Sequence, residues 1–175
     1  MKTNRAAPNR RDVLRRVAAA LTARGQTVAV AESCTAGGLG WALTTDPGSS
    51  AFFKGGVIAY ANDAKKRLLN VAPGALAAHG AVSEPVAVQM AEGARRVFRA
   101  AFGVAITGVA GPAGGTKDKP VGTVWLAVAG PVGAVRRCVH LCGARRRVRE
   151  QAIVAALRML DAELRRPAPA NVTEV

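Results

Sequence analysis

Residues 27–38, T-V-A-V-A-E-S-C-T-A-G-G, decide the fold class of this chain. Four of the first five residues are apolar, and T-V-A-V-A (27–31) predicts a short buried strand. The next seven are mostly small turn residues, and a helical pattern resumes over residues 39–44. A buried strand that turns directly into a helix is the repeating unit of α/β domains.

Helices and strands alternate along the rest of the chain. The segment G-P-V-G (130–133) separates two apolar stretches and predicts a hairpin, which adds antiparallel strands to the sheet. The order of elements therefore predicts a three-layer α/β/α sandwich around a mixed sheet. We expect helices over residues 13–24, 39–44, 84–100 and 144–164, a short helix that carries Leu68 and Leu69, and strands over residues 27–31, 57–60, 103–108, 123–129 and 134–141.

The composition indicates a globular domain with an anionic partner. The 175 residues are 50% hydrophobic, which excludes an intrinsically disordered chain. The 25 Lys and Arg residues exceed the 11 Asp and Glu residues, which gives a formal net charge of +14. This excess favours a nucleic acid, a membrane surface or a phosphorylated small molecule as the partner.

Neither the cysteines nor the apolar runs indicate an exported or membrane protein. Three cysteines cannot form a fully paired disulfide scaffold and suit a reducing compartment. No apolar run approaches the roughly 20 residues that span a bilayer, and the N-terminus lacks the apolar centre of a secretory signal. We therefore expect a cytoplasmic domain over residues 10–165, with a flexible arm at 1–9 and a flexible tail at 166–175.

The turn E-S-C-T-A-G-G (32–38) is the first candidate for chemistry. A serine between a strand and a helix can act as a nucleophile, because the free N–H groups of such a turn can stabilise an oxyanion. Ser33 is our candidate, and an ordinary helix cap in a glycine-rich turn is the alternative. Cys34 is a weaker candidate, since adjacent side chains in a turn usually point apart and free cysteines are commonly buried.

A serine nucleophile needs a base, and the segment Y-A-N-D-A-K-K (60–66) offers a lysine. The two histidines, His79 and His140, do not lie in turns that resemble a catalytic loop. Lys65 can serve as the base if burial lowers its pKa. The alternative is that Lys65, Lys66 and Arg67 form a solvated helix face.

Two further segments suit a phosphate or another anion. The glycine-rich loop at 107–116 follows a strand but matches neither a Walker A motif nor G-x-G-x-x-G, and a mobile surface loop is the alternative. The run R-R-R-V-R (145–149) begins a helix, where cations oppose the helix dipole, so an anion is expected there. A nucleic-acid patch is the competing interpretation.

Cys138, His140 and Cys142 lack a second pair of ligands, and we expect no metal site.

Six motifs occur in one order along the chain. Together they resemble the CinA C-terminal domain family, the nicotinamide-nucleotide amidohydrolases of bacteria, over about residues 10–165. The motifs are A-E-S-C-T-A-G-G (31–38), D-P-G-S-S (46–50), G-V-I-A-Y-A-N-D-A-K (56–65), H-G-A-V-S-E (79–84), A-I-T-G-V-A-G-P (105–112) and K-P-V-G-T-V-W (119–125).

The resemblance implies an activity in pyridine nucleotide recycling, within NAD metabolism. Members of the family hydrolyse the carboxamide of nicotinamide mononucleotide to nicotinate mononucleotide and ammonia, without a metal or other cofactor. The family serine falls on Ser33 and its lysine on Lys65, with Tyr60 beside them. Some members carry a further N-terminal domain, and this chain resembles the form without it. Ala36 departs from the pattern, since a glycine is common there and a positive φ would make alanine costly.

The same resemblance implies a set of substrate-binding residues. We expect backbone N–H groups of the turn after Ser33 to face the oxyanion, and an arginine to bind the phosphate. The expected residues are Cys34, Thr35, Gly37, Gly38, Thr107, Gly108, Arg145, Arg149 and Gln151.

The alternative function is a catalytically silent regulatory module, related to competence or DNA damage, that binds nucleic acid. We also expect a homodimer, because an exposed sheet edge often pairs with itself.

Overall fold

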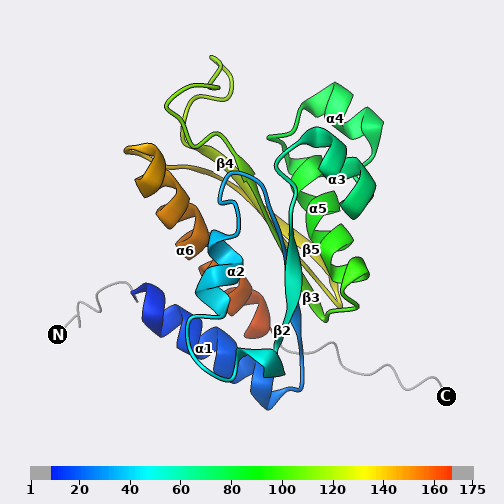
Figure 1. The fold of residues 1–175 in the computed structure, drawn as a ribbon, viewed down its shortest axis with the longest axis vertical. Coiled ribbons are helices and arrows are strands. Elements are labelled where there is room, and N and C mark those ends of the chain that lie inside the picture. Colours follow the sequence, from blue (N-terminus) through cyan, green and yellow to red (C-terminus); the bar gives the residue numbers. More distant parts are fainter. Residues whose placement is uncertain (1–8, 167–175) are drawn as a thin grey trace.

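A computed structural model describes residues 9–166, so the predicted arm and tail fall almost wholly outside the described residues. One mixed sheet of five strands lies between two layers of helices (Figure 1), which confirms the predicted three-layer fold. The strands are β1 (Val28–Glu32), β2 (Phe53–Ile58), β3 (Phe102–Gly108), β4 (Thr123–Gly130) and β5 (Gly133–His140). The helices are α1 (Arg10–Ala23), α2 (Gly38–Leu43), α3 (Asn62–Leu69), α4 (Pro73–His79), α5 (Glu84–Val97) and α6 (Arg145–Leu164).

The order of the strands creates a place for a ligand. The sheet runs β2-β1-β3-β4-β5, with β2, β1 and β3 parallel and the last two pairs antiparallel. The chain leaves β1 toward β2 on one side and later returns to β3 on the other. In open α/β sheets a ligand binds at such a reversal, outside the carboxyl ends of the strands. Ser33 follows the carboxyl end of β1 directly.

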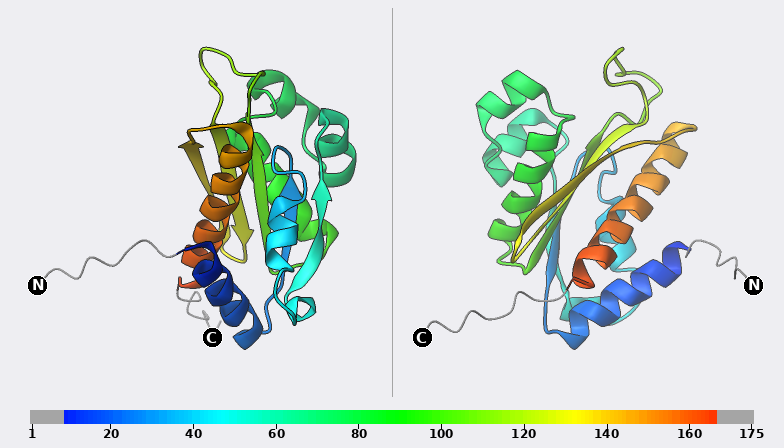
Figure 2. Two further views of the ribbon diagram at one scale, coloured as in Figure 1. Left: turned by 60° about the vertical axis from the view of Figure 1, so that its left-hand side comes forward. Right: turned by 180° about the vertical axis from the view of Figure 1, so that it is seen from behind.

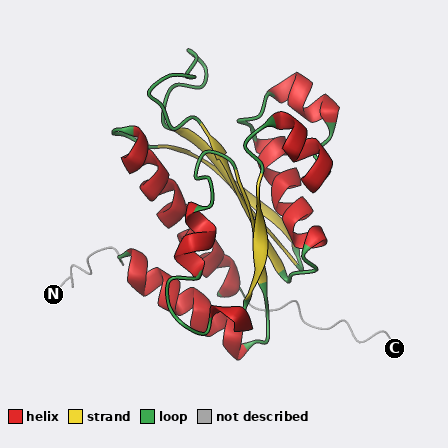
Figure 3. Ribbon diagram, in the orientation of Figure 1, coloured by secondary structure: helices red, strands yellow, loops and turns green. Residues whose placement is uncertain are grey.

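The two faces of the sheet carry side chains of different size. The helices α1, α2 and α6 cover one face, and α3, α4 and α5 cover the other (Figures 2 and 3). Because side chains alternate along a strand, Val28 and Val30 of β1 face the first layer, whereas Ala29 and Ala31 face the second. The first face is therefore built from large aliphatic side chains and the second largely from alanines.

The small side chains allow α5 to lie very close to the sheet and to α3. A Cβ atom at Gly103 of β3 would overlap the carbonyl oxygen of Ala91 on α5. A Cβ atom at Gly93 of α5 would likewise overlap the carbonyl oxygen of Leu69 on α3. A larger residue at either position would force α5 away from its neighbours.

Two local predictions differ from the structure. Strand β2 covers Phe53–Ile58 instead of residues 57–60, because Gly55 and Gly56 lower the strand propensity of its first half. The sequence does not predict helix α4, since Pro73 and Gly74 are typical of turns. Pro73 lies at the first position of that helix, where a missing N–H is tolerated. Within residues 9–166, no helix is long and apolar enough to cross a membrane.

Candidate active site

Ser33 is held at the carboxyl end of β1 by contacts on both sides. Its own N–H donates to the carbonyl of Ile106 on β3 at 2.9 Å, which fixes the start of the turn. The carboxylate of Glu32 accepts hydrogen bonds from the N–H groups of Leu39 (3.0 Å) and Gly40 (2.8 Å). Glu32 is 1% exposed and caps α2 from within the protein. The turn is therefore anchored at its beginning and at its end.

Lys65 reaches Ser33 from the opposite helical layer. It lies on the inward face of α3, one turn before the buried Leu69, and is 1% exposed. Its Nζ lies 3.2 Å from Ser33 Oγ, 2.8 Å from the carbonyl oxygen of Ala59 and 3.2 Å from that of Tyr60. A solvated face is thus the wrong interpretation for Lys65. It does fit Lys66 and Arg67, which pair with Asp63.

The surroundings of Lys65 favour the neutral amine. Burial lowers the pKa of Lys65, because the ammonium form loses its hydration. A neutral amine has two N–H donors for the carbonyl groups of Ala59 and Tyr60. Its lone pair is then left for the hydroxyl proton of Ser33. This geometry suits a general base that activates a serine.

Not all N–H groups of the turn are available to an oxyanion. The N–H of Ala36 donates to the carbonyl of Ser33 at 3.1 Å, and that of Gly38 to the carbonyl of Thr35 at 3.1 Å. Within residues 9–166, the N–H groups of Cys34, Thr35 and Gly37 have no such acceptor. The expectation for Gly38 is therefore wrong as regards its N–H, which is already used inside the turn.

A pocket of about 260 Å³ opens above Ser33 and Lys65. The predicted residues Cys34, Tyr60, Thr107, Gly108 and Arg145 line it, together with Ala81, Val82 and the loop residues Val109, Ala110, Gly111, Ala113 and Gly114. The structure thus brings five of the predicted binding and catalytic residues to the serine and the lysine. The glycine-rich loop after β3 forms a wall of this pocket.

Arg145 lines the same pocket as Lys65. Its guanidinium donates to the carbonyl of Gly111 at 2.9 Å and to the hydroxyl of Tyr60 at 3.2 Å. The tyrosine ring is exposed, and only its main-chain carbonyl contacts Lys65. Thr107 is buried and its hydroxyl donates to the carbonyl of Ala81 at 2.8 Å. Thr107 therefore shapes the pocket, whereas Arg145 keeps further N–H donors for an anion.

Five predicted binding residues do not line this pocket. Gln151 donates to the carbonyls of Cys142 (2.8 Å) and Arg147 (3.1 Å) and lines a separate hollow. Arg149 instead donates to the carbonyl of Thr35 at 2.7 Å. It braces the nucleophile turn from behind, a role that the sequence did not suggest. The other three outside the pocket are Thr35, Gly37 and Gly38 of the turn.

Cys34 is a poor nucleophile despite its place in the pocket. Burial raises the pKa of its thiol to about 11, so the thiolate is scarce at neutral pH. The preference for Ser33 over Cys34 rests on the contact of its hydroxyl with Lys65 Nζ, which can remove the hydroxyl proton. Among the described residues, no group of three His, Cys, Asp or Glu side chains could hold a metal ion.

Ala36 has a φ of +48°, which is the costly case for an alanine. Because its side chain is exposed, Ala36→Gly relieves backbone strain without leaving a cavity. We expect the free energy of unfolding to rise by about 0.5–1 kcal/mol, after the larger entropy of the unfolded glycine chain is subtracted. Urea titration measures this change. Ala19→Gly, at an exposed position inside α1, should lower the stability by about 1 kcal/mol, and a loss in both variants would contradict the argument.

Comparison with known protein families gives one consistent match. A family model described as the CinA C-terminal domain matches residues 10–164. A CinA-like protein of Anaeromyxobacter sp. (strain K) is 59% identical over 151 residues, which are 85% of this chain and 36% of that protein. One of Mycolicibacterium paratuberculosis is 53% identical over 141 residues, or 78% and 32%. The chain spans about a third of the length of these curated relatives.

Solved structures agree with the sequence relatives. The competence/damage inducible protein CihA from Agrobacterium tumefaciens superposes with a TM-score of 0.86 at 40% identity, covering 92% of this chain and 99% of that chain. A CinA superfamily protein from Klebsiella pneumoniae gives a TM-score of 0.86 at 36% identity, covering 90% and 98%. The fold is thus shared along nearly the whole length of both structures.

Proposed function

The chain belongs to the CinA C-terminal domain family, and from this premise we propose that it hydrolyses the carboxamide of nicotinamide mononucleotide. The products are nicotinate mononucleotide and ammonia. The observation that carries the proposal is the 3.2 Å contact between Ser33 Oγ and the buried Nζ of Lys65, at the base of a pocket. A buried lysine beside a serine, with a lowered pKa and no carboxylate bonded to its Nζ among the described residues, suits acyl transfer.

The first half of the reaction forms an acyl-enzyme. Ser33 Oγ attacks the carboxamide carbon while its proton passes to Lys65 Nζ. The negative charge that develops on the amide oxygen is stabilised by N–H groups of the turn that donate to no main-chain carbonyl among the described residues, with that of Cys34 next to the nucleophile. The C–N bond then breaks, and Lys65 returns the proton to the leaving nitrogen, which departs as ammonia.

The second half releases the acid. A water molecule loses a proton to Lys65 and attacks the acyl carbon, and the ester bond to Ser33 breaks as the proton returns to Oγ. The two carbonyl groups that hold Lys65 keep its nitrogen in place through both halves. The lysine thus alternates between base and acid at one position.

Arg145 is our candidate for the substrate phosphate. It lines the pocket, and its hydrogen bonds to Gly111 and Tyr60 leave other guanidinium N–H groups for phosphate oxygens. The positive end of α2 is already neutralised by Glu32, so that helix offers nothing further to an anion. Recognition of the phosphate therefore rests on the arginine.

Ammonia release from nicotinamide mononucleotide and from nicotinamide riboside tests this proposal. We expect kcat/KM to be at least about 30-fold lower for the riboside, because it lacks the charge-assisted hydrogen bonds of the phosphate. A coupled glutamate dehydrogenase assay measures the ammonia. If no ammonia is released from the mononucleotide, the proposal is wrong and the regulatory module is favoured. Such a module should bind DNA with an affinity that falls steeply as the salt concentration rises.

A further inference from the structure

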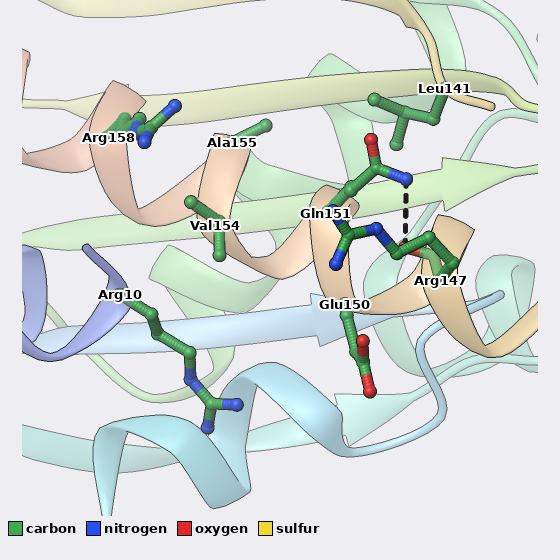
Figure 4. Close-up of a pocket in the computed structure, with 8 residues that line it drawn as sticks. All are labelled: Arg10, Leu141, Arg147, Glu150, Gln151, Val154, Ala155 and Arg158. Carbon is green, nitrogen blue, oxygen red and sulfur yellow. Dashed lines mark hydrogen bonds between the residues drawn. The ribbon is translucent and has the colours of Figure 1, made fainter. Parts of the chain in front are cut away.

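A second hollow lies on the outer side of α6, away from Ser33. Its volume is about 460 Å³, within the range of about 300–1,000 Å³ that is usual for small-molecule sites. Its lining residues share no member with those of the Ser33 pocket. They are Arg10, Leu141, Arg147, Glu150, Gln151, Val154, Ala155 and Arg158, shown in Figure 4.

Positive charge dominates this hollow. Arg10 comes from the first turn of α1, while Arg147 and Arg158 lie along α6 with apolar side chains between them (Figure 4). The one carboxylate, Glu150, is already paired with Arg146 at 2.8 Å. Arg10 and Arg147 thus bring positive charge to the hollow, and its one carboxylate, Glu150, pairs with Arg146 and also feels the charges of these two arginines.

The guanidinium of Arg10 is held in a defined place. It lies over the ring of Trp41 on α2, 5.1 Å from the ring centroid. A guanidinium that stacks on an aromatic face still presents N–H groups along its edge, and this edge matches phosphate oxygens. Arg10 thus meets the requirement that a binding group be oriented before the ligand arrives.

The remaining lining residues suit the organic part of a ligand. Leu141, Val154 and Ala155 give an apolar wall on which a base or sugar can lie. The amide nitrogen of Gln151 is used by the carbonyls of Cys142 and Arg147. Its oxygen is left as an acceptor, as is the second carboxylate oxygen of Glu150, and acceptors of this kind bind ribose hydroxyl or amino groups.

We propose that this hollow binds a nucleoside diphosphate, with the phosphates on Arg10 and Arg147 and the nucleoside against the apolar wall. The site accounts for part of the arginine run that the Ser33 pocket does not use, since Arg145 lines one pocket and Arg147 the other. The proposal stands independently of the activity proposed for Ser33.

Isothermal titration of the full chain with ADP, adenosine and inorganic pyrophosphate tests the proposal. We expect saturable one-to-one binding of ADP, weaker binding of pyrophosphate and none measurable for adenosine. Binding should be unchanged in Ser33→Ala and in saturating nicotinamide mononucleotide. Loss of ADP binding when the mononucleotide is present, with ADP binding retained in Val154→Trp, would place ADP in the Ser33 pocket and overturn the proposal.

Charge reversal at one arginine provides the sharpest variant. Arg147→Glu puts a carboxylate in the first turn of α6, where it favours the helix, so the fold should be kept. We expect ADP affinity to fall by at least about 30-fold, since two charge-assisted hydrogen bonds become a repulsion. The matched control is Arg137→Glu, at an exposed arginine of β5 outside the hollow, which should change affinity by less than about threefold.

Two further results decide between this site and diffuse electrostatics. Val154→Trp fills the hollow without changing its charge and should abolish ADP binding. This variant tests the site even if Arg147→Glu does not fold. Equal losses in Arg147→Glu and Arg137→Glu, with tighter binding to duplex DNA than to ADP, would overturn the proposal in favour of a nucleic-acid surface.

Discussion

Replacement of Ser33 by alanine is expected to lower kcat for amide hydrolysis by at least about 10⁴-fold, because the variant lacks the oxygen atom that forms the acyl-enzyme. The substitution removes one oxygen atom from a buried turn whose backbone is fixed by Glu32 and by the carbonyl of Ile106. We therefore expect the fold to be kept. Ammonia release under single-turnover conditions measures the effect.

The control for this result is Ser50→Ala, at an exposed serine outside the pocket, which should leave kcat within about twofold of the wild type. Circular dichroism and thermal melting of both variants separate loss of chemistry from loss of structure. If Ser33→Ala kept more than about 1% of the wild-type rate, another group would have to be the nucleophile.

Replacement of Lys65 by methionine is expected to lower kcat by about 10²–10⁴-fold, since Ser33 then loses its base. Methionine fills a similar volume without a buried charge. In the wild type, kcat should rise with pH through the lowered pKa of Lys65, because the amine must be neutral to accept a proton. This rise should vanish in the variant. A pH–rate profile of both proteins measures the effect.

The same substitution changes how stability depends on pH. Because the folded pKa of Lys65 lies below its unfolded value of about 10.5, the unfolded chain binds more protons between the two values. The wild type is therefore penalised below the folded pKa, and this penalty disappears as the pH rises toward 10.5. In Lys65→Met the penalty is absent at every pH. Lys66→Met, on the exposed side of α3, is the matched control and should leave both the rate profile and this dependence unaltered.

Much of the fold could be predicted because it depends on patterns that are local in the sequence. The apolar stretch before Ser33 and the hairpin at residues 130–133 each fix an element and its neighbours, and both are observed. The positions of Ser33 and Lys65 in the site follow from motifs at the ends of β1 and β2. Their contact itself depends on how α3 sits against the sheet, which no local pattern encodes.

The arginine run shows why the rest of the site could not be predicted. Successive residues of an α-helix point about 100° apart, so a cluster in the sequence is not a cluster in space. Arg145 enters the Ser33 pocket, Arg146 pairs with Glu150, and Arg149 reaches the carbonyl of Thr35. The role of Glu32 was hidden for a related reason, since its partners are main-chain N–H groups that have no signature in the sequence.

The close approach of α5 has a consequence for the catalytic distance. Gly103 seats α5 on the sheet that carries Ser33, and Gly93 seats α3, with its lysine, on α5. The distance between the Ser33 hydroxyl and the Lys65 amine therefore depends on two close contacts of α5, one with the sheet and one with α3. Each contact is possible because glycine has no side chain. The spacing of the reacting pair is thus set by two glycines that do not line the Ser33 pocket.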